Sequence, residues 1–190
     1  MTFLPEKYQV PQSSGKFMKL EQGDNVFRIL SSAVVGWEYW NKENKPIRSK
    51  EPFTKIPDDI KLDKEGNPTK AKHFWAFIVW DYKDNTIKAL QITQASIQKA
   101  IKGYVDDPDW GDPKKYDFAV TRSGEGLETE YNIRTKPQKE LSADIQKAYE
   151  AEQINLDRVY DGESPFGAET HAEPQEYNAD DEILIDELPS

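Results

Sequence analysis

The sequence predicts a mainly β fold: a five-stranded Greek-key barrel with one packed helix, followed by a C-terminal helix and a disordered acidic tail. Three observations predict it. Strand-like apolar segments recur through residues 26–135, one amphipathic segment interrupts them, and negative charge is concentrated near the C-terminus. The chain has 190 residues, which suits one domain of ordinary size with an appendage.

The strand segments are rich in β-branched and aromatic residues and are separated by turn residues. They are residues 26–30, 34–40, 73–82, 86–92, 116–122 and 128–135. Asn85 predicts a left-handed turn between the third and fourth segments. Gly124 and Gly126 permit the positive φ of a tight hairpin between the last two. Residues 1–22 lack periodicity and predict an N-terminal arm that becomes ordered only where it docks.

Two helices are expected. Residues 93–105 place apolar side chains on one helical face, and the sequence DDP at 106–108 ends that helix. A second helix is predicted from Ser142, its N-cap, to about Gln153. Strands, one helix and a final hairpin are the element order of the OB fold. We therefore expect an OB-fold domain at 23–136, a C-terminal helix at 137–160 and a disordered tail at 161–190.

Composition limits the chemistry. The sequence has no cysteine and two histidines, so disulfides and thiolate nucleophiles are excluded, and no metal or other cofactor is expected. No apolar run approaches the ~18 residues of a membrane span, which predicts a soluble, cytoplasmic protein. Residues 1–136 carry 22 basic and 20 acidic residues, whereas residues 137–190 carry 3 and 15. The net charge of −10 therefore comes from residues 137–190, and residues 1–136 can still bind a polyanion.

Aromatic and basic residues crowd the region between 37 and 82, where residues 42–72 alone hold nine Lys and Arg against six Asp and Glu. A surface that binds single-stranded DNA combines these two residue types, because bases stack on aromatic rings and phosphates attract cations. Side chains in 73–82 alternate between two faces, and a barrel interior accepts only one. The outer aromatic residues therefore either bind bases or pack beneath the insertion or a helix, and any single one is also a candidate for the core.

The candidate site residues are aromatic or basic. We expect bases to stack on Trp37, Tyr39, Trp40, Phe74, Trp75, Trp80, Tyr82 and Tyr131, and phosphates to contact Lys42, Lys45, Arg48, Lys50, Lys72, Lys83, Lys114, Lys115, Arg122 and Arg134. The lysine-rich insertion at 54–72 predicts either a mobile flap that closes over the DNA or a solvated loop.

The end of the chain mixes carboxylates with apolar side chains. It comprises Asp180, Asp181, Glu182, Ile183, Leu184, Ile185, Asp186, Glu187 and Leu188. Such a tail is expected to compete with DNA for a basic groove and to recruit partner proteins; the alternative is a merely solubilising tail. Under the first interpretation, truncation after about residue 160 tightens DNA binding.

Two other classes of function were weighed. Asp81, Asp106 and Asp117 suggest a two-metal nuclease, but the chain lacks a P-loop, and DDPDWGD at 106–112 departs from the EF-hand spacing, so no enzyme is expected. A protein-interaction module, or a DNA-mimic inhibitor that does not bind free oligonucleotide, remains the alternative. Self-association and the preference between DNA and RNA are left open.

Four segments carry a family resemblance: KFMKLEQGDNVFRIL, GWEYW, FWAFIVWD and DWGDPKKYDFAVTRSGEGLETEYNI. Over about residues 16–160 the chain resembles the single-stranded DNA-binding proteins of tailed bacteriophages. The resemblance implies an OB fold that binds and protects single-stranded DNA without sequence preference during phage DNA replication, recombination and repair. It also implies that an acidic tail meets phage or host replication and recombination proteins in the cytoplasm of the infected bacterium. Some relatives contain zinc, but this chain lacks the cysteines that would bind it.

Overall fold

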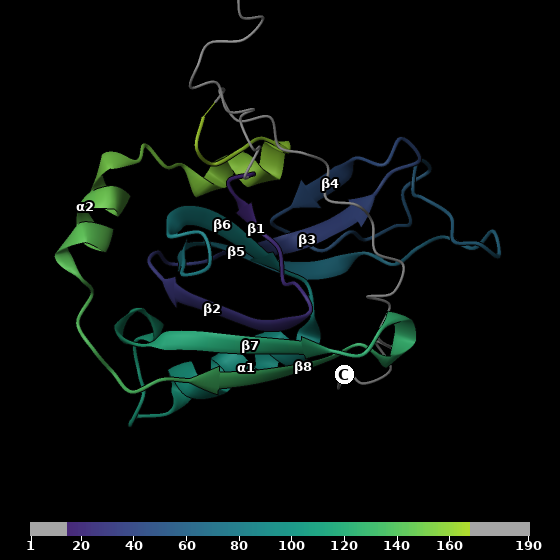
Figure 1. The fold of residues 1–190 in the computed structure, drawn as a ribbon. Coiled ribbons are helices and arrows are strands. Elements are labelled where there is room, and N and C mark those ends of the chain that lie inside the picture. Colours follow the sequence, from purple (N-terminus) through teal and green to yellow (C-terminus); the bar gives the residue numbers. More distant parts are fainter. Residues whose placement is uncertain (1–14, 168–190) are drawn as a thin grey trace, which may run out of the picture.

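The computed structural model describes residues 15–167, which form one mixed β-sheet with helices packed on it (Figure 1). The strands are β1 (Phe17–Met18), β2 (Gly23–Ile29), β3 (Val34–Trp40), β4 (Pro46–Ser49), β5 (Lys72–Asp81), β6 (Thr86–Ile92), β7 (Asp117–Ser123) and β8 (Glu130–Thr135). The helices are α1 (Ala95–Asp106) and α2 (Ala143–Ala151), with short 3-10 helices η1 (Pro113–Lys115), η2 (Gly126–Glu128) and η3 (Leu156–Asp161). The predicted mainly β class is confirmed.

The sheet is built around β2, which is antiparallel to β5 on one side and to β7 on the other. β5 continues past β2 to pair with β3, and β4 pairs with β3 in turn. β6 pairs with β5, and β8 pairs with β7 through the hairpin expected at Gly124 and Gly126. β1 runs parallel to β6, with Phe17 opposite Ala89. The sheet therefore follows the path β1-β6-β5-β2-β7-β8.

The strand pairs of the described residues do not close a barrel, because none of them joins β6 to β8. β1 occupies the edge of β6, where the Ala89 N–H donates to the Lys16 carbonyl at 2.7 Å. α1 packs against β8. The structure thus shows a sheet of eight strands where the sequence predicted a five-stranded Greek-key barrel.

One face of the sheet, the inner face, buries a continuous apolar core. Phe27, Phe77 and Phe118 lie in it with no more than 2% of their surface exposed, and α1 adds Ile97 and Ile101 from its apolar side. Burying this many large side chains supplies most of the stabilisation of the domain, at about 25 cal/mol per Å² of apolar surface. α1 was expected at 93–105 and forms as a one-sided helix packed on the sheet.

The other face, the outer face, is covered by the C-terminal segment. Ile145 of α2 packs on Ile78 of β5, and Val159 of η3 packs on Phe74. Ser142 accepts a hydrogen bond from the Ile145 N–H at 3.4 Å, as expected of the N-cap of α2. β5 is therefore buried on both faces, because α2 and η3 provide the second cover that a small sheet by itself lacks.

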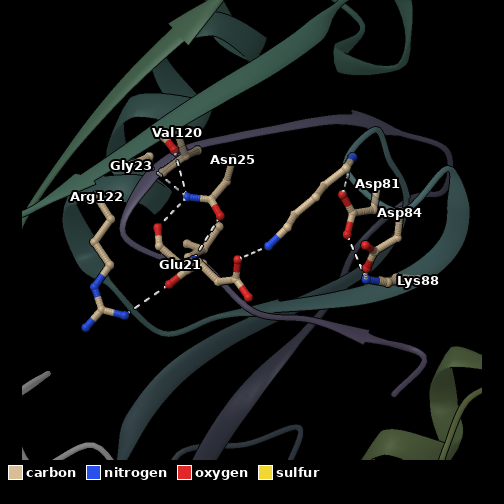
Figure 2. A network of polar contacts seen from close by, with 10 residues as sticks. Glu21, Gly23, Asn25, Asp81, Asp84, Lys88, Val120 and Arg122 are labelled. Atoms are coloured by element: carbon tan, nitrogen blue, oxygen red, sulfur yellow. Dashed lines mark hydrogen bonds and ion pairs between the residues drawn. The ribbon is translucent and has the colours of Figure 1, made fainter. Parts of the chain in front are cut away.

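A polar network fixes the segment before β2 (Figure 2). The Asn25 side-chain amide donates to the carbonyls of Glu21, Gly23 and Val120, and its oxygen accepts from the Glu21 N–H at 2.8 Å. Two further contacts join this segment to β7 and to the β5–β6 turn: Arg122 donates to the Leu20 carbonyl, and Lys83 pairs with Glu21. The network continues from the Lys83 N–H to Asp81, which Lys88 also binds together with Asp84. Residues 15–22 of the predicted arm are thus docked.

The C-terminal boundary differs from the expectation. Ser164 is buried, and Phe166 packs on the outer core with the Lys16 ammonium 4.7 Å from its ring centroid. Residues 161–167 therefore belong to the packed domain and not to the tail. Residues 1–14 and the rest of the predicted tail, 168–190, lie outside the described residues. Within the described part, no helix is long and apolar enough to cross a membrane.

Candidate nucleic-acid interface

An aromatic surface remains on the inner side of the sheet where β3 pairs with β5. Val35 lies opposite Trp75, and Trp37 lies opposite His73, with 5.1 Å between the two ring centroids. Val35 is 47% exposed, and the three rings are half-buried. We call these four residues the aromatic face. Flat rings that are anchored on strands and keep part of their surface in solvent are suited to stack bases.

Alternation along β3 and β5 sends the neighbouring side chains to the outer face. Phe74 is fully buried beneath η3, whereas Trp80 and Tyr82 pack on the outer core near α2. Tyr82 donates its hydroxyl to Asp117 at 2.9 Å. These three residues were predicted to stack bases, but the structure places them among packed side chains.

The other predicted aromatic residues have mixed surroundings. Tyr39 is 7% exposed; its hydroxyl donates to Asp59 at 2.8 Å, and its ring contacts Phe53 edge-on. Burial, together with the Asp59 carboxylate, raises the pKa of Tyr39 to about 12. Trp40 ends β3, and Tyr131 packs half-buried at the edge of the inner core. None of these residues belongs to the aromatic face.

Arg48 was predicted to contact phosphate, yet its guanidinium is committed within the protein. It donates to Glu38 at 2.9 Å, to the Gln91 side chain at 2.9 Å and to the Val159 carbonyl at 3.0 Å. The Arg48 and Glu38 side chains are 10% and 5% exposed. Arg48 therefore fastens η3 to the outer face of the sheet.

Four further predicted cations hold protein groups. Lys83 pairs with Glu21, Arg134 pairs with Asp24 at 3.2 Å, Lys50 lies 3.6 Å from Asp157, and Arg122 donates to the Leu20 carbonyl at 3.0 Å. The first three pairs are exposed at the surface, so water and salt screen them and DNA phosphates can compete for these cations.

The insertion is tied down and forms a finger that extends beyond β3 and β4 (Figure 1). The Lys61 N–H donates to the Trp40 carbonyl at 2.8 Å, and the Lys42 ammonium donates to the Asp58 carbonyl at 2.9 Å. Ile60 is 5% exposed. Residues 41–45 and 50–71, which we call the finger, therefore form an extension of the sheet, where the sequence predicted either a mobile flap or a solvated loop at 54–72. Lys42 and Lys45 are exposed on it, and Lys72 follows at the start of β5.

Lys114 and Lys115 lie elsewhere, on η1, before the first residue of β7. Their place at one end of β7, with the β7–β8 turn at the other, separates them from the finger (Figure 1). Lys114 and Lys115 are thus set apart from the lysines of the finger.

The three aspartates considered for a nuclease are not gathered. Asp81 pairs with Lys88, Asp106 with Lys102, and Asp117 with Arg28. In the ranges that the structure describes, no group of three or more His, Asp or Glu side chains is placed to hold a metal ion.

Two members of the aromatic face, His73 and Val35, were not predicted as site residues. Strand alternation could have identified both, because side chains two residues apart point to the same face of a sheet. His73 lies two residues before Trp75, and Val35 lies two before Trp37.

A comparison with known proteins bears on this interface. The chain is 29% identical, over 140 residues, to the "Probable ssDNA-binding protein" of Escherichia phage T5, covering 63% of this chain and 54% of the relative. The chain resembles a phage single-stranded DNA-binding protein. This similarity confirms the resemblance found in the sequence, although the match spans only about half the length of the relative. No known family profile matches the chain, and no solved structure is significantly similar to it.

Proposed function

We propose that this protein binds single-stranded DNA without sequence preference, stacking bases on the aromatic face while lysines of the adjoining finger contact phosphates. The observation that carries the proposal is the half-buried cluster of Trp37, His73 and Trp75 on the one side of the β3–β5 pair that the C-terminal segment leaves uncovered. Stacking is tolerant of sequence because every base has a π-face. The printed name of the phage T5 relative supports the same ligand.

We further propose that the domain is an open variant of the OB fold. β2 and β3 together correspond to its long first strand, β5 and β6 follow as a meander, α1 precedes the last two strands, and β7 and β8 form the final hairpin. OB folds bind oligonucleotides on the face of their second and third strands, which here are β5 and β6. The aromatic face lies on β3 and β5, so it shares one of these two strands.

The acidic tail is proposed to compete with DNA and to recruit replication and recombination proteins. This role would suit a protein acting in phage DNA replication, recombination and repair in the cytoplasm of an infected cell. The packing of Ser164 and Phe166 shows where the tail can be removed: truncation must follow Gly167, since a cut near residue 160 would also remove part of the outer core.

The test is fluorescence anisotropy of labelled oligo-dT and of a matched duplex, titrated with the full-length protein and with a chain ending at Gly167 across a salt series. We expect preference for the single strand, weaker binding at higher salt with a log-log slope of about −0.7 per phosphate contacted, and tighter binding after truncation at low salt. Absence of oligonucleotide binding by both chains would refute the proposal and favour the protein-interaction module. Equal affinity of the two chains would reduce the tail to a solubilising segment.

A further inference from the structure

Two backbone segments bring four lysines together near the beginning of β7. The Lys136 N–H donates to the Asp117 carbonyl at 2.9 Å, and the Lys139 N–H donates to the Lys115 carbonyl at 3.0 Å. The buried Arg28 guanidinium joins both segments by donating to the Lys114 and Lys139 carbonyls. Residues 114–115 and 136–139 are therefore held side by side, and all four lysines are exposed. We call Lys114, Lys115, Lys136 and Lys139 the lysine cluster.

One acidic group close to the lysine cluster, Asp117, is already paired within the protein. Asp117 is 3% exposed, and its carboxylate accepts from Arg28 at 2.6 Å and from the Tyr82 hydroxyl at 2.9 Å. Lys139 lies 3.6 Å from the same carboxylate. Because Arg28 already balances Asp117, this carboxylate does not neutralise the lysines. The ammonium groups of Lys114 and Lys115 have no acidic partner among the described residues.

An aromatic residue borders the lysine cluster. Trp110 is half-buried, with Tyr104 edge-on at 5.6 Å and Tyr116 at 5.2 Å between ring centroids. The Gln138 side chain donates to the Trp110 carbonyl at 2.9 Å, which joins the loop of Trp110 to the segment that carries Lys136 and Lys139. A supported aromatic ring beside exposed lysines is the combination that binds single strands.

The lysine cluster is separate from the aromatic face, and α1 spans the distance between them. Near the start of α1, Gln98 donates to the His73 carbonyl at 3.1 Å, whereas Tyr104 near its end contacts Trp110. These two contacts are six residues apart, which is about 9 Å along the helix axis. Figure 1 likewise shows η1 and the beginning of β7 on the side of the molecule away from the finger.

We propose that the lysine cluster and Trp110 form a second contact site for the same DNA strand, beyond the other end of α1 from the aromatic face. This inference rests on the proposed function and specifies how much of a strand one molecule engages. A short oligonucleotide reaches the aromatic face alone. A longer one also reaches the lysine cluster, where the ligand is the sugar–phosphate backbone.

The test compares the double variant K114A/K115A with the wild-type chain on oligo-dT of about 3 and about 20 nucleotides, lengths that bracket the footprint of one OB-type domain, about 4–16 nucleotides. The matched control is K19A/K147A, which removes two exposed lysines from outside the cluster. We expect K114A/K115A to weaken binding of the longer oligonucleotide by roughly tenfold and to reduce its salt slope by about 1.4, at about 0.7 per phosphate. Binding of the shorter oligonucleotide and all binding by the control remain unchanged.

Three results would overturn the proposal. Equal weakening for both lengths, or for both double variants, would show a general electrostatic effect and no separate site. Unchanged binding of the longer oligonucleotide would show that the cluster does not contact DNA. An effect present in the full-length chain and absent from one ending at Gly167 would show that the cluster holds the acidic tail. If the wild-type chain bound neither oligonucleotide, the proposed function itself would fail, which is a distinguishable outcome.

Discussion

The Arg28 guanidinium donates to the Asp117 carboxylate at 2.6 Å across the β2–β7 pair, and both side chains are almost completely buried, at 1% and 4% exposure. Removing one partner of a buried ion pair leaves the other charge without compensation in a medium of low dielectric constant. The pair therefore constrains the sheet at the point where β7 begins.

Asp117→Asn should destabilise the fold by about 3–5 kcal/mol, because it leaves the buried Arg28 charge without its carboxylate. The measurement is the free energy of unfolding from urea denaturation. Asp24→Asn is the control, since Asp24 pairs with Arg134 at the exposed surface and its loss should change stability little. If the two substitutions lowered the free energy of unfolding by similar amounts, burial would not explain the cost of breaking the Arg28–Asp117 pair.

Gly36→Ala should destabilise the domain, whereas Gly103→Ala should stabilise it. A Cβ at Gly36 would lie 2.5 Å from the Ser49 carbonyl oxygen and 3.0 Å from the Tyr160 ring, and a strand backbone cannot easily move away. Such overpacking costs about 1–3 kcal/mol. Gly103 lies within α1 with open space around it, and Ala there gains about 1 kcal/mol of helix propensity. Urea midpoints that move in the same direction for both variants would refute this reading.

Elements with strong local signals could be predicted from the sequence. The strands at 34–40 and 86–92 form at the predicted residues, because β-branched residues, joined by aromatic ones in 34–40, are bounded there by turns. β1 and β4 were missed since two and four residues carry no periodicity. Their positions depend on partners distant in the sequence, which local patterns do not encode.

The candidate site was harder to predict because alternation identifies two faces and not which one is covered. Phe74 and Trp75 are equally aromatic neighbours in sequence, and only the docking of η3 decides that Phe74 is core. Arg48 resembles a phosphate ligand until β4 is known to place it opposite Glu38. The contact that decides Phe74 joins residues far apart along the chain, and the one that decides Arg48 depends on a short strand pair that carries no local signal.

Stability should fall as the pH rises from about 10 to about 12, partly through Tyr39 and Tyr82. Burial and carboxylate neighbours, Asp59 and Asp117 respectively, raise the pKa of each phenol to about 12. A folded-state pKa above the unfolded value of 10.0 favours the neutral phenol. This stabilisation is therefore complete below pH 10 and is lost as the pH passes through about 12.

The check is the urea midpoint measured between about pH 9 and about pH 11.5, for the wild-type chain and for Tyr39→Phe. The variant lacks the ionisable hydroxyl at this position, so its midpoint should depend less steeply on pH. Parallel profiles for the two proteins would show that Tyr39 does not contribute.

Trp37→Ala should weaken binding of oligo-dT by roughly 5- to 150-fold, the equivalent of about 1–3 kcal/mol for one lost base stack. Trp80→Phe is the matched control, because Trp80 lies on the same sheet but packs on the outer core beneath the C-terminal segment. It should lower the urea midpoint and leave DNA affinity unchanged. Anisotropy measures the affinities, and quenching of tryptophan fluorescence on adding oligo-dT should shrink in Trp37→Phe but persist in Trp80→Phe. If Trp80 proved to be the residue on which affinity depends, the strand would bind the outer face, and α2 and η3 would have to move away to admit it.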